Sequence, residues 1–136
     1  MLTQSPTIQR SSQRLILALT PSFLKLKYRL YLRDISQAYV QSTTSLNRDF
    51  YVRAPAEVSK ILHLDTDRIL KVIKPLYGIP EAGNHWFSTY HLYYTEKLKM
   101  AESTYDPCLL YTYQEGYGVI GLQTDDTLFI SDEKFA

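Results

Sequence analysis

Residues 119–130 read Val119-Ile120-Gly121-Leu122-Gln123-Thr124-Asp125-Asp126-Thr127-Leu128-Phe129-Ile130, two apolar segments that flank a pair of aspartates. Both segments are rich in residues that favour β-structure, so the stretch predicts a strand, a tight polar turn and a second strand. Two adjacent carboxylates repel each other, and a divalent cation would relieve that repulsion. A solvated Asp-rich turn explains the same residues without a metal, and for this stretch alone it is the simpler interpretation.

A third carboxylate, Asp34, lies near the end of the segment Tyr28-Arg29-Leu30-Tyr31-Leu32-Arg33-Asp34-Ile35. Strand alternation puts Asp34 on the face of Leu30 and Leu32, where a carboxylate is costly unless it is paired or bound to a metal. If this strand lies beside the one next to the Asp pair, the three carboxylates converge, as in a two-metal phosphoryl-transfer site. Oxygen ligands of this kind suit magnesium better than zinc. The alternative is an Asp at an exposed strand end that caps the following turn.

Four motifs follow one another along most of the chain. They are Asp34-Ile35-Ser36-Gln37-Ala38-Tyr39, Pro75-Leu76-Tyr77-Gly78-Ile79-Pro80-Glu81-Ala82-Gly83-Asn84-His85-Trp86, Ser103-Thr104-Tyr105-Asp106-Pro107-Cys108-Leu109-Leu110 and Gln123-Thr124-Asp125-Asp126. Together they resemble the palm motifs of copia-type retrotransposon reverse transcriptases, and the run from Gln37 to Ser42 is similar to fungal members. Four ordered motifs are a far more specific signal than an isolated Asp pair.

The resemblance implies an RNA-directed DNA polymerase, of which residues 1–136 form one partial domain, a palm with a remnant of the fingers. It implies that the basic fingers strand lies upstream, and that the thumb, connection and RNase H regions lie downstream. It also implies two Mg²⁺ ions, replaceable by Mn²⁺, that are held by Asp34, Asp125, Asp126 and the Ile35 carbonyl. One ion would lower the pKa of the primer 3′-hydroxyl, and the other would hold the nucleotide phosphates.

The resemblance also assigns substrate-binding roles. Tyr39 would be the aromatic gate that excludes a 2′-hydroxyl, although a core tyrosine is the alternative. Tyr77 and Gly78 would approach the template–nucleotide pair, where glycine allows close backbone approach. Gln123 stands where the family usually has an aromatic residue, and it would hydrogen-bond the primer end. The implied partners are an RNA or DNA template with primer, deoxynucleoside triphosphates and the other polyprotein regions of the same element.

The loop after Tyr77-Gly78 departs from the family pattern. That loop usually reads Leu-Lys-Gln-Ala-Pro-Arg, whereas here Glu81 replaces glutamine and Asn84 replaces arginine. Both changes are expected to remove contacts to the substrate, and without fingers and thumb we expect the chain to be inactive by itself. Two alternatives come from other classes. One is a catalytically dead nucleic-acid-binding or interaction module, and the other is a metal-dependent phosphodiester hydrolase with the same carboxylates.

Composition fits a part of such an enzyme. A chain of 136 residues, 45% of them hydrophobic, predicts one ordered domain with a modest core. Residues 1–60 hold nine Lys/Arg against three Asp/Glu, a balance of +6, and residues 61–136 hold six against eleven, a balance of −5. A basic half beside an acidic half suits nucleic acid facing metal-loaded carboxylates, although two solvated faces would give the same split.

Cysteine usage and hydropathy bear on the compartment. A single cysteine, Cys108, cannot form an internal disulfide, which is typical of a reducing compartment. No apolar run is long enough for a signal peptide or a membrane span, so no membrane is expected. The resemblance implies the cytoplasm, within a virus-like particle in an intact element, or the nucleus.

Periodicity and turn residues predict an α+β fold, in which helices cover one face of an antiparallel sheet and leave the other face for substrate. Helices are expected from Ser5-Pro6 to Thr20-Pro21, at 57–64 and from Pro80 to about Lys99, and a tight turn or short helix is expected at 36–41. Strands are expected at 28–35, 50–53, 69–73, 108–113, 117–123 and 127–131, with a turn at Gln114-Glu115-Gly116.

Overall fold

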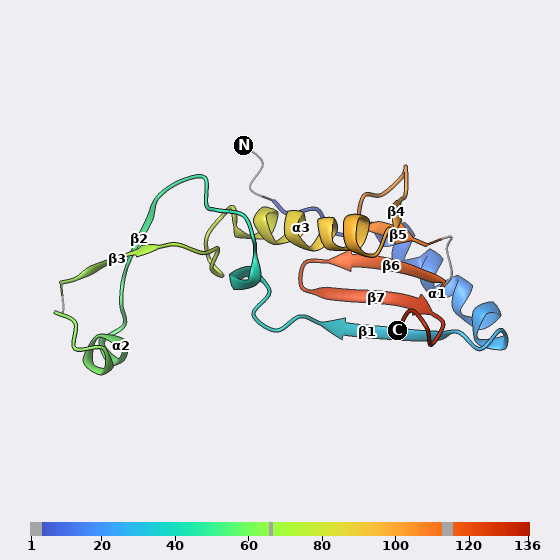
Figure 1. Cartoon of the computed structure of the whole chain (residues 1–136), viewed down its shortest axis with the longest axis horizontal. Helices are drawn as coiled ribbons and strands as arrows, with labels where there is room; N and C mark the ends of the chain where they lie inside the picture. Colours follow the sequence, from blue (N-terminus) through green and yellow to red (C-terminus); the bar gives the residue numbers. More distant parts are fainter. Residues whose placement is uncertain (1–3, 66, 113–115) are drawn as a thin grey trace.

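The computed structural model describes residues 4–65, 67–112 and 116–136, and its centre is a five-stranded antiparallel sheet (Figure 1). In their order across the sheet the strands are β1 (Arg29–Asp34), β7 (Asp126–Ser131), β6 (Gly118–Gln123), β5 (Leu109–Tyr111) and β4 (Ala101–Glu102). An α+β fold with an antiparallel sheet is therefore confirmed. The short strand β4 was not predicted, and the predicted residues Tyr113, Gln114 and Glu115 lie outside the described residues.

The strand–turn–strand prediction for residues 119–130 is confirmed. Strands β6 and β7 pair from Gly118 opposite Ser131 to Gln123 opposite Asp126, which leaves Thr124 and Asp125 as the connecting turn. Thr124 has φ 54°, a left-handed conformation that tight hairpin turns require. On its other side, β7 pairs with β1 along its whole length.

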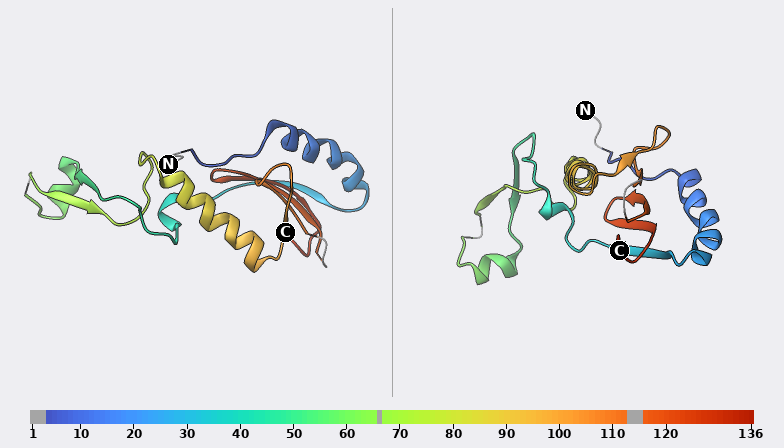
Figure 2. Two further views of the ribbon diagram at one scale, coloured as in Figure 1. Left: turned by 90° about the horizontal axis from the view of Figure 1, so that it is seen from above. Right: turned by 45° about the vertical axis from the view of Figure 1, so that its right-hand side comes forward.

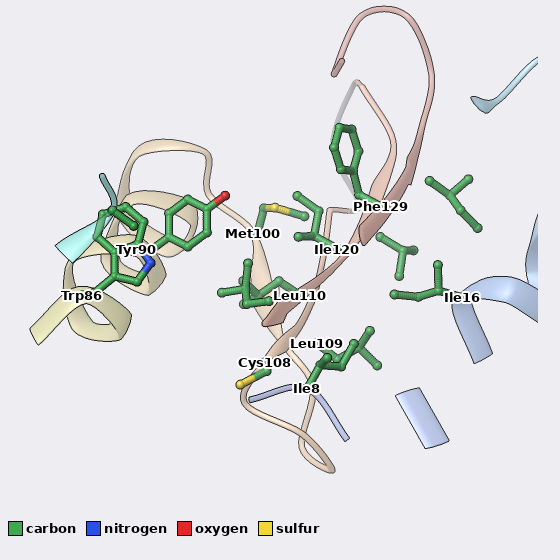
Figure 3. Packing of buried hydrophobic residues seen from close by; sticks show 14 residues of the cluster. Ile8, Ile16, Trp86, Tyr90, Met100, Cys108, Leu109, Leu110, Ile120 and Phe129 are labelled. Atoms are coloured by element: carbon green, nitrogen blue, oxygen red, sulfur yellow. The ribbon is translucent and has the colours of Figure 1, made fainter. Parts of the chain in front are cut away.

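The expectation that helices cover one face of the sheet is wrong, because a helix packs on each face (Figures 2 and 3). Helix α1 (Arg10–Lys25) covers the face of Gly121, where an added Cβ would collide with Ile8 and would lie 3.1 Å from Ile16 Cδ1. Helix α3 (Ala82–Leu92) covers the opposite face, where the Tyr90 and Thr127 hydroxyls are 2.5 Å apart.

Strand β6 explains why both faces are covered. Its first five residues are all buried, so apolar side chains point to both sides and each side needs a covering layer. In Figure 3, Trp86 and Tyr90 of α3 lie on one side of the sheet and Ile16 of α1 on the other. The core cluster consists of Ile8, Ile16, Ala38, Trp86, Tyr90, Met100, Cys108, Leu109, Leu110, Val119, Ile120, Leu122, Phe129 and Ile130.

Helix α1 begins and ends later than Ser5-Pro6 and Thr20-Pro21 predicted. The segment before it is extended because it pairs with β6, with the Ile8 N–H donating to the Leu122 carbonyl at 2.9 Å. The helix continues through Pro21 to Lys25. Phe23 in its last turn packs against Tyr28 and Tyr117, with ring centroids 5.2 and 5.3 Å away. Tertiary packing therefore outweighs both local signals.

Helix α3 is shorter than the prediction to Lys99. After Leu92 the chain makes one π-helical turn, Tyr93–Lys97, whose Leu98 N–H donates to the Tyr93 carbonyl at 3.2 Å. Lys99 then takes a left-handed conformation, φ 54°, which ends the helical segment.

A second unit projects from the sheet as an arm (Figure 1). It consists of the antiparallel pair β2 (Phe50–Arg53) and β3 (Ile69–Val72) with helix α2 (Ala56–Ile61) between them. These elements agree with the prediction to within a few residues. The short 3₁₀ helix Tyr39–Gln41 connects β1 to the arm. Among the described helices, none combines the length and apolarity that crossing a bilayer requires.

Candidate functional site

The predicted carboxylates lie at one edge of the sheet, where β1 ends and the β6–β7 hairpin turns. Asp34, the last residue of β1, is directly opposite Asp126, the first residue of β7. Directly opposed residues of antiparallel strands project from the same face. Asp125 lies in the turn, immediately before Asp126, and the Asp125 carbonyl accepts the Ile35 N–H at 2.9 Å. The end of β1 is thus fastened to the hairpin tip.

This edge is open to solvent. Asp34 and Asp126 are exposed and Asp125 is half-buried. Leu32, on the same face as Asp34, is itself 72% exposed, so Asp34 does not bear the cost expected for a carboxylate on a buried apolar face. Like charges directly opposite each other on neighbouring strands are nevertheless destabilising, and a bound cation would remove that repulsion.

The structure does not gather all three carboxylates into one cage. Across the described ranges, no three His, Cys, Asp or Glu side chains lie close enough together to hold a metal ion. The donor chemistry still fits magnesium, because Asp34 and Asp126 offer hard oxygen ligands. Magnesium also keeps several waters and is commonly bound through one or two carboxylates plus substrate phosphates. The pair Asp34 and Asp126 therefore suits a partly hydrated Mg²⁺ ion.

Gln123 extends the same row of side chains by one strand. It is opposite Asp126, so Gln123, Asp126 and Asp34 follow one another across β6, β7 and β1 on the α1 face. Its Oε1 accepts a hydrogen bond from Gln13 Nε2 of α1 at 2.7 Å. Contact with a primer end would have to replace or share this bond.

Two tyrosines lie beside the hairpin tip. Tyr39, the first residue of the 3₁₀ helix, is half-buried and stacks on Tyr77, with ring centroids 4.2 Å apart and planes 15° apart. The Tyr77 hydroxyl donates to Asp125 Oδ2 at 3.3 Å. Burial raises the pKa of Tyr39, and the negative charge of Asp125 raises it further. The same two causes raise the pKa of Tyr77. Tyr39 thus lies next to the carboxylate edge.

Gly78 is needed for its backbone conformation. It has φ 94°, and the Ile79 N–H donates to the Leu76 carbonyl at 3.1 Å, which closes a tight turn. An added Cβ would meet no atom within 4 Å, so any side chain would fit the space but would strain the backbone. The turn presents Tyr77, the residue before Gly78, towards Asp125.

Glu81, which stands where the family usually has glutamine, is buried at the start of α3. It is 1% exposed, and its Oε1 accepts the Asn47 N–H at 2.9 Å. Its Oε2 lies 3.6 Å from Arg48 Nε, and His85 Nε2 lies 3.9 Å from Oε1. Glu81 therefore fastens the loop before β2 to the start of α3. Asn84 is half-buried and has partners of its own.

Two anchoring contacts were not predicted from the sequence. Asp106 is 1% exposed and accepts three hydrogen bonds, from Gln9 N at 2.8 Å, Ser12 Oγ at 2.6 Å and Cys108 N at 3.0 Å. It joins the start of α1 to the start of β5. The bond from Cys108 N is the local turn in which an Asp side chain accepts the backbone N–H two residues later. The sequence Asp106-Pro107-Cys108 could therefore have predicted this contact. Trp86 donates Nε1–H to the Thr124 carbonyl at 2.7 Å and so supports the hairpin turn.

The fold and this edge define a small α+β domain with opposed carboxylates at a hairpin tip, and comparison with known proteins finds distant relatives. The chain is 26% identical over 100 residues to the transposon Ty1-NL2 Gag-Pol polyprotein of Saccharomyces cerevisiae, a match covering 74% of the chain and 5% of the relative. It is 24% identical over 133 residues to the Ty1-ER2 Gag-Pol polyprotein of the same yeast, covering 96% of the chain and 7% of the relative.

Both relatives are Gag-Pol polyproteins of Ty1, which is a copia-type element, and the chain is distantly similar to them. The chain spans less than a tenth of the length of these relatives. No protein-family model matches the chain. No solved structure matches it either.

Proposed function

We propose that this chain is the palm-centred part of a copia-type reverse transcriptase, and that Asp34, Asp125 and Asp126 bind Mg²⁺ for nucleotidyl transfer in the intact enzyme. The observation that carries the proposal is the direct opposition of Asp34 and Asp126, with Asp125 in the adjoining turn. The order of the four motifs and the similarity to Ty1 Gag-Pol polyproteins support it.

Bound Mg²⁺ would neutralise charge on the nucleotide phosphates and lower the pKa of the primer 3′-hydroxyl. The protein's share of the work is to position groups and to balance charge. Asp34, Asp125 and Asp126 would hold the metal at the open edge, and the Ile35 carbonyl would add an oxygen ligand. Tyr39 would limit the space beside the sugar, and Gln123 would contact the primer end.

We expect no processive DNA synthesis by the 136-residue chain itself. Phosphate contacts supply most of the non-specific affinity of proteins for nucleic acid. In the family these contacts come largely from the fingers and thumb. The template, primer and deoxynucleoside triphosphates are therefore proposed partners of the intact enzyme.

Primer extension by a longer polypeptide that restores fingers and thumb tests the proposal. Asp34→Asn and Asp125→Asn should each reduce templated extension at least about 100-fold, because each removes a ligand whose charge the transition state needs. Glu133→Gln is the matched control, since Glu133 is an exposed carboxylate just beyond the opposite end of β7. Extension that survives either aspartate substitution would contradict the proposal.

The second candidate is a catalytically inactive nucleic-acid-binding module. It is favoured by the observation that, within the described residues, the three carboxylates do not form one group. Salt-dependent binding of primer–template by the restored polypeptide, without incorporation of nucleotides, would support this candidate. Metal-dependent incorporation would exclude it.

A further inference from the structure

Three segments that are distant in the sequence meet at the tip of the β6–β7 hairpin. Ile35 donates its N–H to the Asp125 carbonyl at 2.9 Å, and Trp86 donates Nε1–H to the Thr124 carbonyl at 2.7 Å. The Tyr77 hydroxyl donates to Asp125 Oδ2 at 3.3 Å. The first two contacts hold the backbone of the turn, whereas the third reaches the carboxylate group itself.

Tyr77 is held in place from two sides. The tight turn closed by Leu76 and Ile79, with Gly78 at φ 94°, fixes the direction of its backbone. The Tyr39 ring stacks on the Tyr77 ring with centroids 4.2 Å apart, although more than half of the Tyr77 side chain remains exposed. An exposed tyrosine without such supports would sample several rotamers, and its hydroxyl would not stay near one acceptor.

We propose that Tyr77 is a positioning residue whose hydroxyl orients the Asp125 carboxylate for a divalent ion, and that Tyr39 braces the Tyr77 ring. The inference rests on the proposed metal site. It adds to the motif-based role of Tyr77, which concerns the template–nucleotide pair. The physical reason is general, because hydrogen bonds to metal-binding carboxylates fix their orientation and are needed for full metal affinity.

The geometry also limits the size of the effect. Loss of a partner of a metal ligand commonly costs about 10- to 100-fold in metal affinity. The O···O distance of 3.3 Å is longer than the usual 2.7–2.8 Å, so the contact is a weak one. We therefore expect Tyr77→Phe to weaken Mn²⁺ binding about threefold to tenfold.

The first measurement needs no metal. Three-bond couplings to the Asp125 side chain report its χ1 rotamers, and the wild-type chain should show one dominant rotamer. Tyr77→Phe keeps the ring and removes the hydroxyl, so the couplings should become averaged. Tyr39→Leu removes the stacked ring and should give partial averaging. Tyr105→Phe makes the same chemical change on a side chain that is 88% exposed, and it should leave the couplings unchanged.

The second measurement is Mn²⁺ affinity by calorimetry on the same variants. Averaged couplings in Tyr77→Phe together with weaker Mn²⁺ binding support the proposal. Unchanged couplings overturn it whether or not the chain binds metal. Averaged couplings with unchanged, Asp125-dependent Mn²⁺ affinity overturn the metal-positioning role. If the couplings average but the wild type binds no Mn²⁺, the orienting contact stands and the metal-positioning role fails, whereas the proposed function is decided separately by primer extension in the longer polypeptide.

Discussion

Replacement of Asp106 by alanine should be among the most destabilising single substitutions in this chain. The carboxylate is 1% exposed and accepts hydrogen bonds from Gln9 N, Ser12 Oγ and Cys108 N. Hydrogen bonds to a charged group contribute about 1.5–3 kcal/mol each, and the three are not additive because they share one acceptor group. Gln9 is exposed and can be rehydrated, so the expected loss is about 3–5 kcal/mol of unfolding free energy.

Urea unfolding followed by circular dichroism measures this loss as a lower midpoint with an unchanged slope. Glu133→Ala, which removes an exposed carboxylate, is the control and should leave the midpoint unchanged. If Asp106→Ala does not fold, Ser12→Ala removes one of the three donors and should cost about 1 kcal/mol. Equal midpoints for Asp106→Ala, Ser12→Ala and the control would refute the assignment of Asp106 as the anchor of α1.

Three further predictions concern the core and its titrating groups. Gly121→Val should cost about 1–3 kcal/mol in chemical unfolding, because its side chain would overlap Ile8, which precedes α1, and would crowd Ile16 of α1. Ala18→Val on the exposed side of α1 should cost much less, and equal losses would contradict this packing. Burial, reinforced by the charge of Asp106, raises the pKa of the Cys108 thiol to about 12. A thiol reagent at pH 8 should therefore label Cys108 only as the chain unfolds, and immediate labelling would contradict its burial. Burial also raises the pKa of Tyr94 and of Tyr117, so the native state holds these two protons more tightly than the unfolded state. The free energy of unfolding should therefore be unaffected below about pH 10 and should fall as the pH rises beyond it. A flat stability profile up to about pH 11 would contradict this prediction.

Local sequence signals predicted most of the fold. The β6–β7 hairpin followed from two apolar β-favouring segments around a polar turn, and the arm matches the strands predicted at 50–53 and 69–73 and the helix predicted at 57–64. The run Val119-Ile120-Gly121-Leu122 could have predicted that both faces of the sheet are covered, because a continuous apolar strand is typical of a sheet buried on both faces. The boundaries of α1 could not be predicted locally, since they depend on pairing with β6 and on packing around Phe23.

The candidate site was predictable in part. The sequence indicated that Asp34 and the Asp125-Asp126 pair would end up near one another, and the register places Asp34 opposite Asp126. The sequence did not indicate that Leu32 would be exposed. The predicted cost of placing the Asp34 carboxylate on a buried apolar face therefore does not arise. The contact between Tyr77 and Asp125 depends on a turn 48 residues away in sequence, and spacing alone carries no signal for it.

The central claim is that the open edge formed by Asp34 and Asp126 binds a divalent metal. Anomalous diffraction from crystals of the chain soaked in Mn²⁺ tests it most directly, because manganese is located by its own scattering. The account predicts an anomalous peak within about 2.5 Å of carboxylate oxygens of Asp34 and Asp126, with no peak there in Asp34→Asn crystals. A map without a peak at this edge, or with one that persists in Asp34→Asn, would contradict the claim.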